Sequence, residues 1–509
     1  MTSRPPYDQL VGELREGGVL ESVQCLLEWD QETLMPPRGA ERRAEEIALL
    51  SRIIHEKKTA PRVGELLDRA AGEKDLGPDA RANLREARRH YERARKLPAD
   101  LVAEIARTRS LACEAWKAAR RANDFPKFAP WLEKTFHLAR EKASRLGWKD
   151  SPYDALLEEH EPGMTTARLV SLFGELRKGL VPLVKAIAGS RRRPDRNLLS
   201  GKFPAAHQEE FARRVATDLG LDFSGARLDR SAHPFCMGLT PDDVRITTRY
   251  NESDCLSALF GVIHETGHAL YDQGIAPELV WTPIGQPRSL GVHESQSRLW
   301  ENQVGRSRAF WSHYLPLLSE RFPSLSGVAH ARSGRGADLD RFHFAVNQVE
   351  PSLIRTEADE VTYNLHILLR FDIERDLLAG ELAVSDLPDL WRSRMASDLG
   401  VRPDTDADGV LQDIHWSIGL VAYFPTYTLG NMLAAQLHAR ARADIPDLEV
   451  FFARGEFRPL LDWLRDRIHR HGSRYETEEL VQRAVGTRLS TAPFLDYLRA
   501  KYSPLYGIS

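Results

Sequence analysis

Cysteine, net charge and long apolar runs are all scarce in this sequence, and each scarcity argues against a class of protein. Its 509 residues include four cysteines, none in a C-x-x-C pair, so neither a disulfide framework nor a cysteine zinc site is predicted. The 70 Lys and Arg residues nearly balance the 73 Asp and Glu residues, which argues against a nucleic-acid-binding protein. No apolar run approaches the roughly 18 residues of a membrane-spanning helix, and the first residues contain no secretion-signal core. We therefore expect a cytoplasmic protein with neither a membrane nor a nucleic acid as partner.

The sequence instead contains helical patterning along most of its length. Hydrophobic residues make up 42 % of the chain, which is enough for a large core at this length. Residues 78–122 predict two charged helices that meet near Pro98. Residues 243–250 alternate and are rich in β-branched side chains, which predicts a strand, with residues 226–229 as its candidate partner. Since no repeat or long linker interrupts the pattern, we predict a mainly α protein of one unit (residues 1–509) with a small antiparallel β-sheet.

The strongest chemical signal is the motif His264-Glu265-x-x-His268, which follows an apolar helical segment. Residues four apart share a helix face, so the two histidines can direct imidazole nitrogens at one ion, and zinc suits such a pair. Glu265 lies off that face, where it can take a proton from water and pass it to a leaving amine. Composition alone predicts about 0.04 chance copies of H-E-x-x-H in such a chain. The alternative is a pair of ordinary helix histidines that bind no metal.

A third protein ligand is needed, and spacing alone leaves its identity open. Glu294 and Glu301 lie two turns apart on one face of a predicted helix over residues 292–306, so either can face the metal. His293 is a further candidate. Asp272, one turn beyond the second histidine, can be a ligand, an orienting acceptor or a surface charge.

The motif and its surroundings resemble the carboxypeptidase Taq family of metallocarboxypeptidases. As in that family, H-E-x-x-H is followed by a His-Glu-Ser-Gln run, here His293 to Gln296. Four further stretches are similar to short signatures of the family: His233-Pro234-Phe235, Asp243 to Thr247, Ile354 to Glu360 and Gly409 to Trp416. The similarity extends from about Trp29 to the C-terminal helices, so it covers almost the whole chain.

This resemblance implies a fold, an activity and a ligand set. The implied fold is a nearly all-helical body split by a deep groove, with the metal at its floor and about residues 1–200 as one wall. The implied activity is release of single residues from peptide C-termini, with broad side-chain tolerance and poor cleavage of C-terminal proline. The implied third ligand is Glu294, the metal is Zn²⁺ with Co²⁺ as a substitute, and the assembly is a homodimer.

An exopeptidase of this kind needs a cation for the terminal carboxylate of its substrate. Arginine suits the task because its planar fork binds a carboxylate with two parallel hydrogen bonds. Arg355, in the Ile-Arg-Thr motif, is the first candidate, and Arg245 and Arg370 are the next. The alternative for each is an ordinary salt bridge with a neighbour such as Asp359.

The oxyanion that forms during peptide hydrolysis needs a donor besides the metal. Tyr423 and Tyr427, which follow the Gln-Asp-x-His-Trp motif, are the candidates, and His415 and His233 are further donors. The alternative for the tyrosines is aromatic packing. Three more side chains are expected to orient the histidines: Asp243, Asp359 and Gln412.

The favoured prediction is a zinc carboxypeptidase that trims peptides with a free C-terminus. One rival is a zinc oligoendopeptidase on a similar helical fold, which would share Glu265 and the metal ligands but need no carboxylate clamp. The other is a helical scaffold with an inactive or coincidental metal site, against which the intact motif counts.

Overall fold

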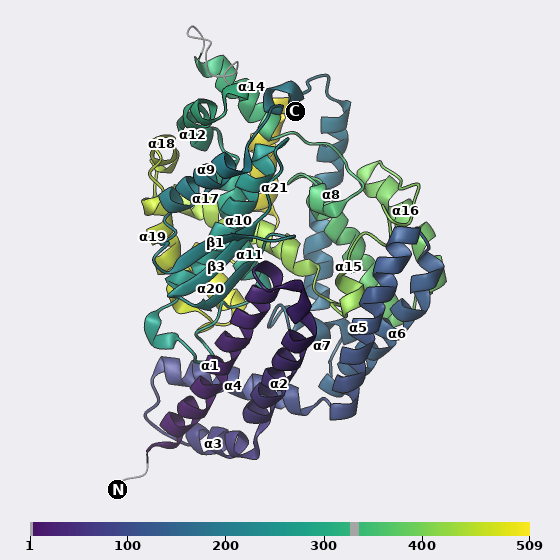
Figure 1. The fold of residues 1–509 in the computed structure, drawn as a ribbon, viewed down its shortest axis with the longest axis vertical. Coiled ribbons are helices and arrows are strands. Elements are labelled where there is room, and N and C mark those ends of the chain that lie inside the picture. The colour runs from purple at the N-terminus through teal and green to yellow at the C-terminus, as the bar shows by residue number, and fades with distance from the viewer. Residues whose placement is uncertain (1–3, 326–334, 509) are drawn as a thin grey trace.

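The computed structural model describes residues 4–325 and 335–508 and folds them into a mostly helical body with one small sheet (Figure 1). This confirms the mainly α prediction. The helices of the first half are α1 (Pro6–Thr33), α2 (Ala40–Thr59), α3 (Pro61–Ala71), α4 (Pro78–Arg95), α5 (Ala99–Ala122), α6 (Phe125–Leu146), α7 (Pro152–Leu157), α8 (Thr166–Gly189) and α9 (Ala205–Leu219). Those of the second half are α10 (Cys255–Gly274), α11 (Leu290–Arg298), a π-helix (Leu299–Gly305), α12 (Arg308–Arg321), α14 (Arg335–Val346), α15 (Tyr363–Ala379), α16 (Leu387–Leu399), α17 (Pro425–Asp444), α18 (Leu448–Ala453), α19 (Arg458–Arg467), α20 (Thr477–Val485) and α21 (Ala492–Tyr506). Within the described ranges, no helix has the length and apolarity needed to cross a bilayer.

Local signals in the sequence explain where several helices begin and end. The predicted junction at Pro98 is the boundary between α4 and α5, and Pro98 itself, at φ −61°, precedes the first turn of α5. The Asp254 side chain accepts hydrogen bonds from the backbone N–H groups of Leu256 and Ser257 and so caps α10. Ser289 caps α11 in the same way, with 3.1 Å between its Oγ and the nitrogen of Val292. Each cap is worth about 1 kcal/mol and sets the start of a helix that carries the candidate metal site.

The sheet has three strands, and its central strand is the last in sequence. The strands are β1 (Ala226–Arg230), β2 (Cys236–Thr240) and β3 (Asp243–Thr248). β3 pairs with β1 in parallel and with β2 in antiparallel fashion, so that Leu228 and Cys236 both lie opposite Ile246. The sheet is therefore mixed, and the expectation of an antiparallel sheet holds only for the β2–β3 pair. The reason is the order of the strands. β2 runs opposite to β1 but does not pair with it, and after the turn at residues 241–242 the chain enters as β3 between the two. Because β3 runs opposite to β2, it runs in the direction of β1.

Two large apolar clusters fill the body, and α17 contributes to both. The first is formed by α9, α10, α12, α18, α19, α20 and the inner face of the sheet. The second is formed by α5, α6, α7, α8, α15, α16 and α21. Leu433 and Leu437 of α17 belong to the first cluster, and Leu429 and Met432 belong to the second. In Figure 1 the first cluster's elements, with the sheet, α10 and α11, lie to the left of α5, α6, α15 and α16. The centre of the molecule is thus where α10, α11 and α17 meet.

Candidate active site

Two glycines let the three central helices approach one another closely. A Cβ on Gly267, inside the H-E-x-x-H motif, would lie 2.6 Å from the carbonyl oxygen of Gln296 and from the Cα of Ser297. A Cβ on Gly430 of α17 would lie 2.5 Å from Cγ of Glu294. Backbone packing without a side-chain spacer therefore brings α10 and α17 against α11, with Glu294 between them.

The close approach gathers three donor atoms of the kind that zinc prefers. Oε2 of Glu294 lies 3.5 Å from Nε2 of His264 and 3.3 Å from Nε2 of His268. The donor atoms of the three residues all lie within 4.8 Å of one another. Two imidazole nitrogens and one carboxylate are the protein ligands of many hydrolytic zinc sites, in which a fourth position stays open. The three side chains therefore fit a catalytic zinc ion.

Glu301, one of the alternative ligands, lies on the far side of His264. Its Oε2 is 2.9 Å from Nδ1 of His264, whereas Nε2 of the same ring faces Glu294. A metal-ligating histidine usually donates its other ring N–H to a carboxylate, which fixes the tautomer and the ring plane. The geometry therefore assigns Glu301 to orienting His264 rather than to ligation.

The other two alternatives, His293 and Asp272, are paired with each other. Nε2 of His293 lies 3.2 Å from Oδ1 of Asp272. The ring of His293 stacks on the ring of His268, with centroids 4.2 Å apart and planes at 18°. Nδ1 of His268 is buried and has no hydrogen-bond partner among the described residues, so the ring is contacted by this stacking and by Glu294 at its Nε2.

Arg298 links the two glutamates of the site and was not considered in the sequence analysis. Its Nε lies 2.7 Å from Oε1 of Glu294, and its Nη1 lies 3.1 Å from Oε2 of Glu301. Burial opposes ionisation of Glu294, but Arg298, His264 and His268 together outweigh it and hold the pKa of Glu294 well below its usual range. The four-residue spacing between Glu294 and Arg298 on one helix was a signal that could have revealed the pair.

Glu265 is buried beside this cluster, with 6 % of its surface exposed. Burial raises the pKa of Glu265 to about 7, while the neighbouring His264 acts to lower it and the negative Glu294 to raise it. A divalent cation at the three ligands would favour the ionised carboxylate. Glu265 therefore has the surroundings of a proton acceptor that works near neutral pH.

Arg355 and Arg370 share one carboxylate in a buried cluster. Nε and Nη2 of Arg355 lie 3.0 and 2.8 Å from Oδ1 of Asp413, and Nε of Arg370 lies 2.6 Å from Oδ2. Nη1 of Arg355 donates to Oη of Tyr363 at 2.9 Å, and the ring of Tyr363 lies 4.9 Å from the guanidinium carbon of Arg298. One aromatic ring therefore separates this cationic cluster from the glutamates of the metal site.

Tyr423 and Tyr427 lie beside the arginine cluster, since the guanidinium carbon of Arg355 is 5.2 Å from the ring of Tyr427. Burial raises the pKa of Tyr423, and the negative charge of Glu294 raises it further. Oη of Tyr427 lies 3.1 Å from Nε2 of His415. The two tyrosine rings are 5.5 Å apart. The structure thus brings three of the four predicted oxyanion donors together.

A buried glutamate, Glu374, positions the loop that carries Tyr423. It accepts hydrogen bonds from Oη of Tyr153 (2.8 Å), Nε1 of Trp416 (2.8 Å) and the backbone N–H of Ala422 (3.2 Å). Ala422 has φ +63°, which is rare for a residue with a Cβ and costs of order 1 kcal/mol. The sequence carries no signal for this contact, because Glu374 lies 48 residues before Ala422.

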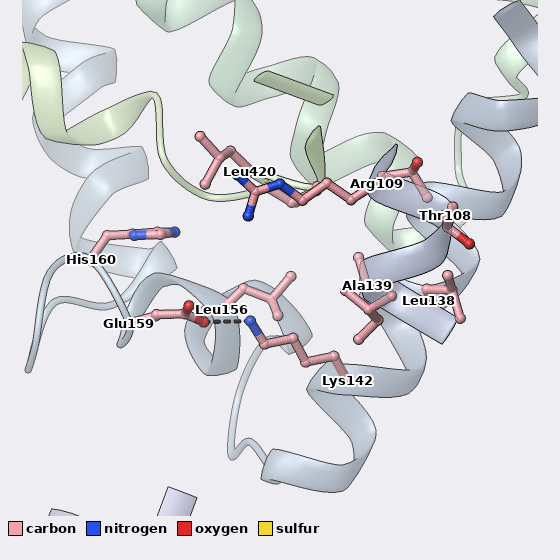
Figure 2. A pocket seen from close by; sticks show the side chains of 13 residues that line it. Thr108, Arg109, Leu138, Ala139, Lys142, Leu156, Glu159, His160 and Leu420 are labelled. Atoms are coloured by element: carbon pink, nitrogen blue, oxygen red, sulfur yellow. Dashed lines mark hydrogen bonds and ion pairs between the residues drawn. The ribbon is translucent and has the colours of Figure 1, made fainter. Parts of the chain in front are cut away.

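A pocket of about 60 Å³ adjoins the same loop (Figure 2). It is lined by α5, α6, residues 419–421 and His160, whose ring also contacts Tyr423 at a centroid distance of 5.2 Å. Figure 2 shows the ion pair between Lys142 and Glu159 on its wall. The metal ligands do not line this pocket, which is therefore separate from the metal site.

The structure places two other predicted residues outside this cluster. Arg245, on β3, makes two 2.9 Å bonds to Asp243 and lies 4.4 Å from the ring of Trp29 in α1. His233 is exposed on the loop between β1 and β2, where its carbonyl oxygen accepts a bond from Ser231. A role for His233 as a donor stays a prediction.

The expectation that Asp243, Asp359 and Gln412 orient the histidines is not met. Asp243 pairs with Arg245, and Asp359 accepts from the backbone N–H groups of Val361 and Thr362, just before α15. Oε1 of Gln412 accepts from the backbone N–H of Arg355. These three side chains therefore bind Arg245 or backbone N–H groups instead of a histidine. Glu301 is the carboxylate that contacts a histidine of the metal site.

Comparisons with known proteins agree with this arrangement. Residues 9–502 match the family model described as carboxypeptidase Taq (M32) metallopeptidase. The chain is 47 % identical to thermostable carboxypeptidase 1 of Thermus thermophilus over 519 residues, covering 100 % of both chains. It is 40 % identical to carboxypeptidase 1 of Bacillus subtilis over 484 residues, covering 95 % of each.

A solved structure supports the same relationship. The crystal structure of the M32 carboxypeptidase from Deinococcus radiodurans R1 matches with a TM-score of 0.95 and 43 % identity, covering 99 % of this chain and 100 % of the other. The matched region includes the helices that carry the H-E-x-x-H motif and Glu294. The chain therefore belongs to the carboxypeptidase Taq (M32) family and is a metallocarboxypeptidase.

Proposed function

We propose that this protein removes single residues from the C-termini of peptides, with His264, His268 and Glu294 holding a zinc ion. The observation that carries the proposal is the convergence of the three donor atoms within 4.8 Å, beside the buried Glu265. When bound there, zinc would supply a Lewis acid that polarises the peptide carbonyl and acidifies water. Co²⁺, which accepts the same ligands, is proposed as a substitute.

Glu265 serves as the general base and then as the proton donor. It takes a proton from the attacking water and returns it to the amide nitrogen, which then leaves as the amine of the released residue. Tyr423 and Tyr427 donate hydrogen bonds to the oxygen on which negative charge develops. His415, next to Tyr427, holds that phenol in position.

Recognition of the free C-terminus is assigned to Arg355, with Arg370 beside it. The two guanidinium groups face the single carboxylate of Asp413, so the buried cluster of these three side chains has a net charge of +1. Three of the five N–H groups of Arg355 are used by Asp413 and Tyr363, which leaves two for a substrate carboxylate. A buried excess cation attracts an anion strongly, and this is what a peptide's terminal carboxylate supplies.

We predict that Arg355→Ala lowers kcat/KM for peptides with a free C-terminus by about one to two decades. The lost charge-assisted bond is worth about 1.5–3 kcal/mol. C-amidated peptides cannot use the clamp, so their already poor rate should hardly change. The ratio of the two effects, measured by product release from matched peptides, is the informative quantity.

Arg245→Ala is the matched control, since it also breaks a two-bond ion pair but lies on β3. Its effect on both peptides should be small. Equal losses for both peptides in Arg355→Ala would mean a structural role, and the clamp would then pass to Arg370.

The second candidate function is that of a zinc oligoendopeptidase. It would use the same ligands and Glu265 but would not need the excess cation at Asp413. Digestion of one peptide in N-blocked and C-amidated forms distinguishes the two. We expect the N-blocked form to lose residues one at a time and the C-amidated form to resist, whereas internal cleavage of both would establish an endopeptidase.

The remaining features of the proposal come from the family. They are broad side-chain tolerance with poor cleavage of C-terminal proline, a homodimer in the cytoplasm, and a single unit over residues 1–509. About residues 1–200 would form one wall of the substrate groove. Cross-linking and sedimentation would test the dimer, and a panel of peptides that differ in the last residue would test the tolerance.

A further inference from the structure

A π-helix, Leu299–Gly305, continues α11 directly beyond the metal ligand Glu294. All seven residues are buried. Such wide turns are rare and occur frequently at functional sites. Glu301 lies within it, bonded to Nδ1 of His264 and to both Arg298 and Arg306. The wide turn therefore contributes the carboxylate that orients a metal-binding histidine.

The C-terminal helix α21 holds this π-helix by one backbone carbonyl. The carbonyl oxygen of Asn302, next to Glu301, accepts from Oη of Tyr497 at 3.0 Å and lies 3.5 Å from Nζ of Lys501. Nζ of Lys501 also donates to Oη of Tyr497 at 3.0 Å. The two side chains, one helical turn apart, thus converge on a single carbonyl of the turn that carries Glu301.

Glu360 anchors both of these donors. It forms an ion pair with Lys501 and accepts a hydrogen bond from Tyr502 at 2.5 Å, and its Oε2 lies 3.0 Å from Oη of Tyr497. The side chains of the ion pair are 9 % and 2 % exposed. Buried ion pairs add little stability over apolar packing of the same volume, so a role in fixing one geometry explains this one better.

We propose that Lys501, with Tyr497 and Glu360, is a positioning group for the metal site. It holds the carbonyl of Asn302, fixes the π-helix, and so keeps Glu301 against His264. This rests on the proposed function, since it takes His264, His268 and Glu294 as the zinc ligands. It assigns a role at the site to the last helix of the chain, about 200 residues from the ligands in sequence.

The test is a double-mutant cycle on zinc affinity, measured by competition with a chromogenic chelator. Loss of a group that orients a ligand typically weakens metal binding by about 10–100-fold, so we expect that from Glu301→Gln. Lys501→Met should weaken zinc binding by about fivefold to tenfold, because Lys501 acts on His264 only through Glu301. In the Glu301→Gln background, Lys501→Met should add less than about twofold, because its route to the metal is already broken.

Lys142→Met is the matched control, since Lys142 also forms an ion pair, with Glu159, but lies beside the pocket of Figure 2. It should leave zinc affinity unchanged. The thermal midpoint of each zinc-free variant shows whether it is folded. If Lys501→Met does not fold because Glu360 is left unpaired, the charge-neutral pair Lys501→Met/Glu360→Gln replaces it in the cycle.

The outcomes test the positioning role of Lys501 and the metal site separately. An equal loss from Lys501→Met in both backgrounds, or none in either, overturns the positioning role and leaves the metal site intact. Full zinc affinity in His264→Ala overturns the metal site itself, and the positioning role with it. Non-additivity together with a lost site in His264→Ala supports both.

Discussion

Glu265→Gln is expected to keep its zinc and its fold while losing nearly all turnover. Glutamine has the same shape as glutamate but cannot accept the proton of the attacking water. General acid–base catalysis contributes about a hundredfold to ten-thousandfold, and Glu265 acts in both directions, so we expect the loss near the upper limit. The measurement is kcat/KM on one N-blocked peptide, with zinc content determined on the same preparation.

Asp272→Asn is the matched control for that experiment. Asp272 is another buried carboxylate on α10, two turns beyond Glu265, and pairs with His293. If removal of any buried negative charge on this helix lowered the rate, both variants would fail alike. We expect Asp272→Asn to lose less than about tenfold. A zinc-replete Glu265→Gln protein with substantial activity would exclude the general-base role.

Glu294→Ala is expected to lose most of its zinc. The side chain supplies one of only three protein ligands, and structural zinc sites with four ligands bind with about 10–16 kcal/mol. One ligand therefore accounts for a few kcal/mol, or about two decades or more in affinity. Elemental analysis after equilibration with a weak chelator should show little metal, and activity should fall in proportion.

Glu301→Ala serves as the comparison for this variant. Because Glu301 contacts Nδ1 of His264, its loss should weaken zinc binding without abolishing it. The order of the two effects is the test. If Glu294→Ala retained its metal and Glu301→Ala did not, the two glutamates would have exchanged roles.

Several local features could be predicted because they depend on residues close together in the sequence. The four-residue spacing of His264 and His268 places both on one face of α10, whatever surrounds that helix. The break at Pro98 likewise acts within the chain around one element, as does the alternation over residues 243–250, of which 243–248 form β3. Resemblance across the chain then selected Glu294, which spacing alone could not distinguish from Glu301.

What only the tertiary structure decided are contacts between distant segments. Glu301 and Glu294 share a helix face in sequence terms, but the π-turn between α11 and α12 sends one to Nδ1 and the other towards Nε2 of the same imidazole. Neither Asp413, placed between Arg355 and Arg370, nor the support of Ala422 by Glu374 has a sequence signal.

The sequence by itself thus determined the helical class, the histidine pair and the adjacent base, since periodicity and short motifs depend on a few consecutive residues. The third ligand's geometry was decided by the packing of α10, α11 and α17, the direction of β3 by the order of the strands in the sheet, and the pairing of buried charges by contacts between segments far apart in the sequence. The physical basis of these features is long-range, because the partner that a buried polar group finds depends on which elements pack together and how closely. At the metal site, Gly267 and Gly430 set the distance between the helices.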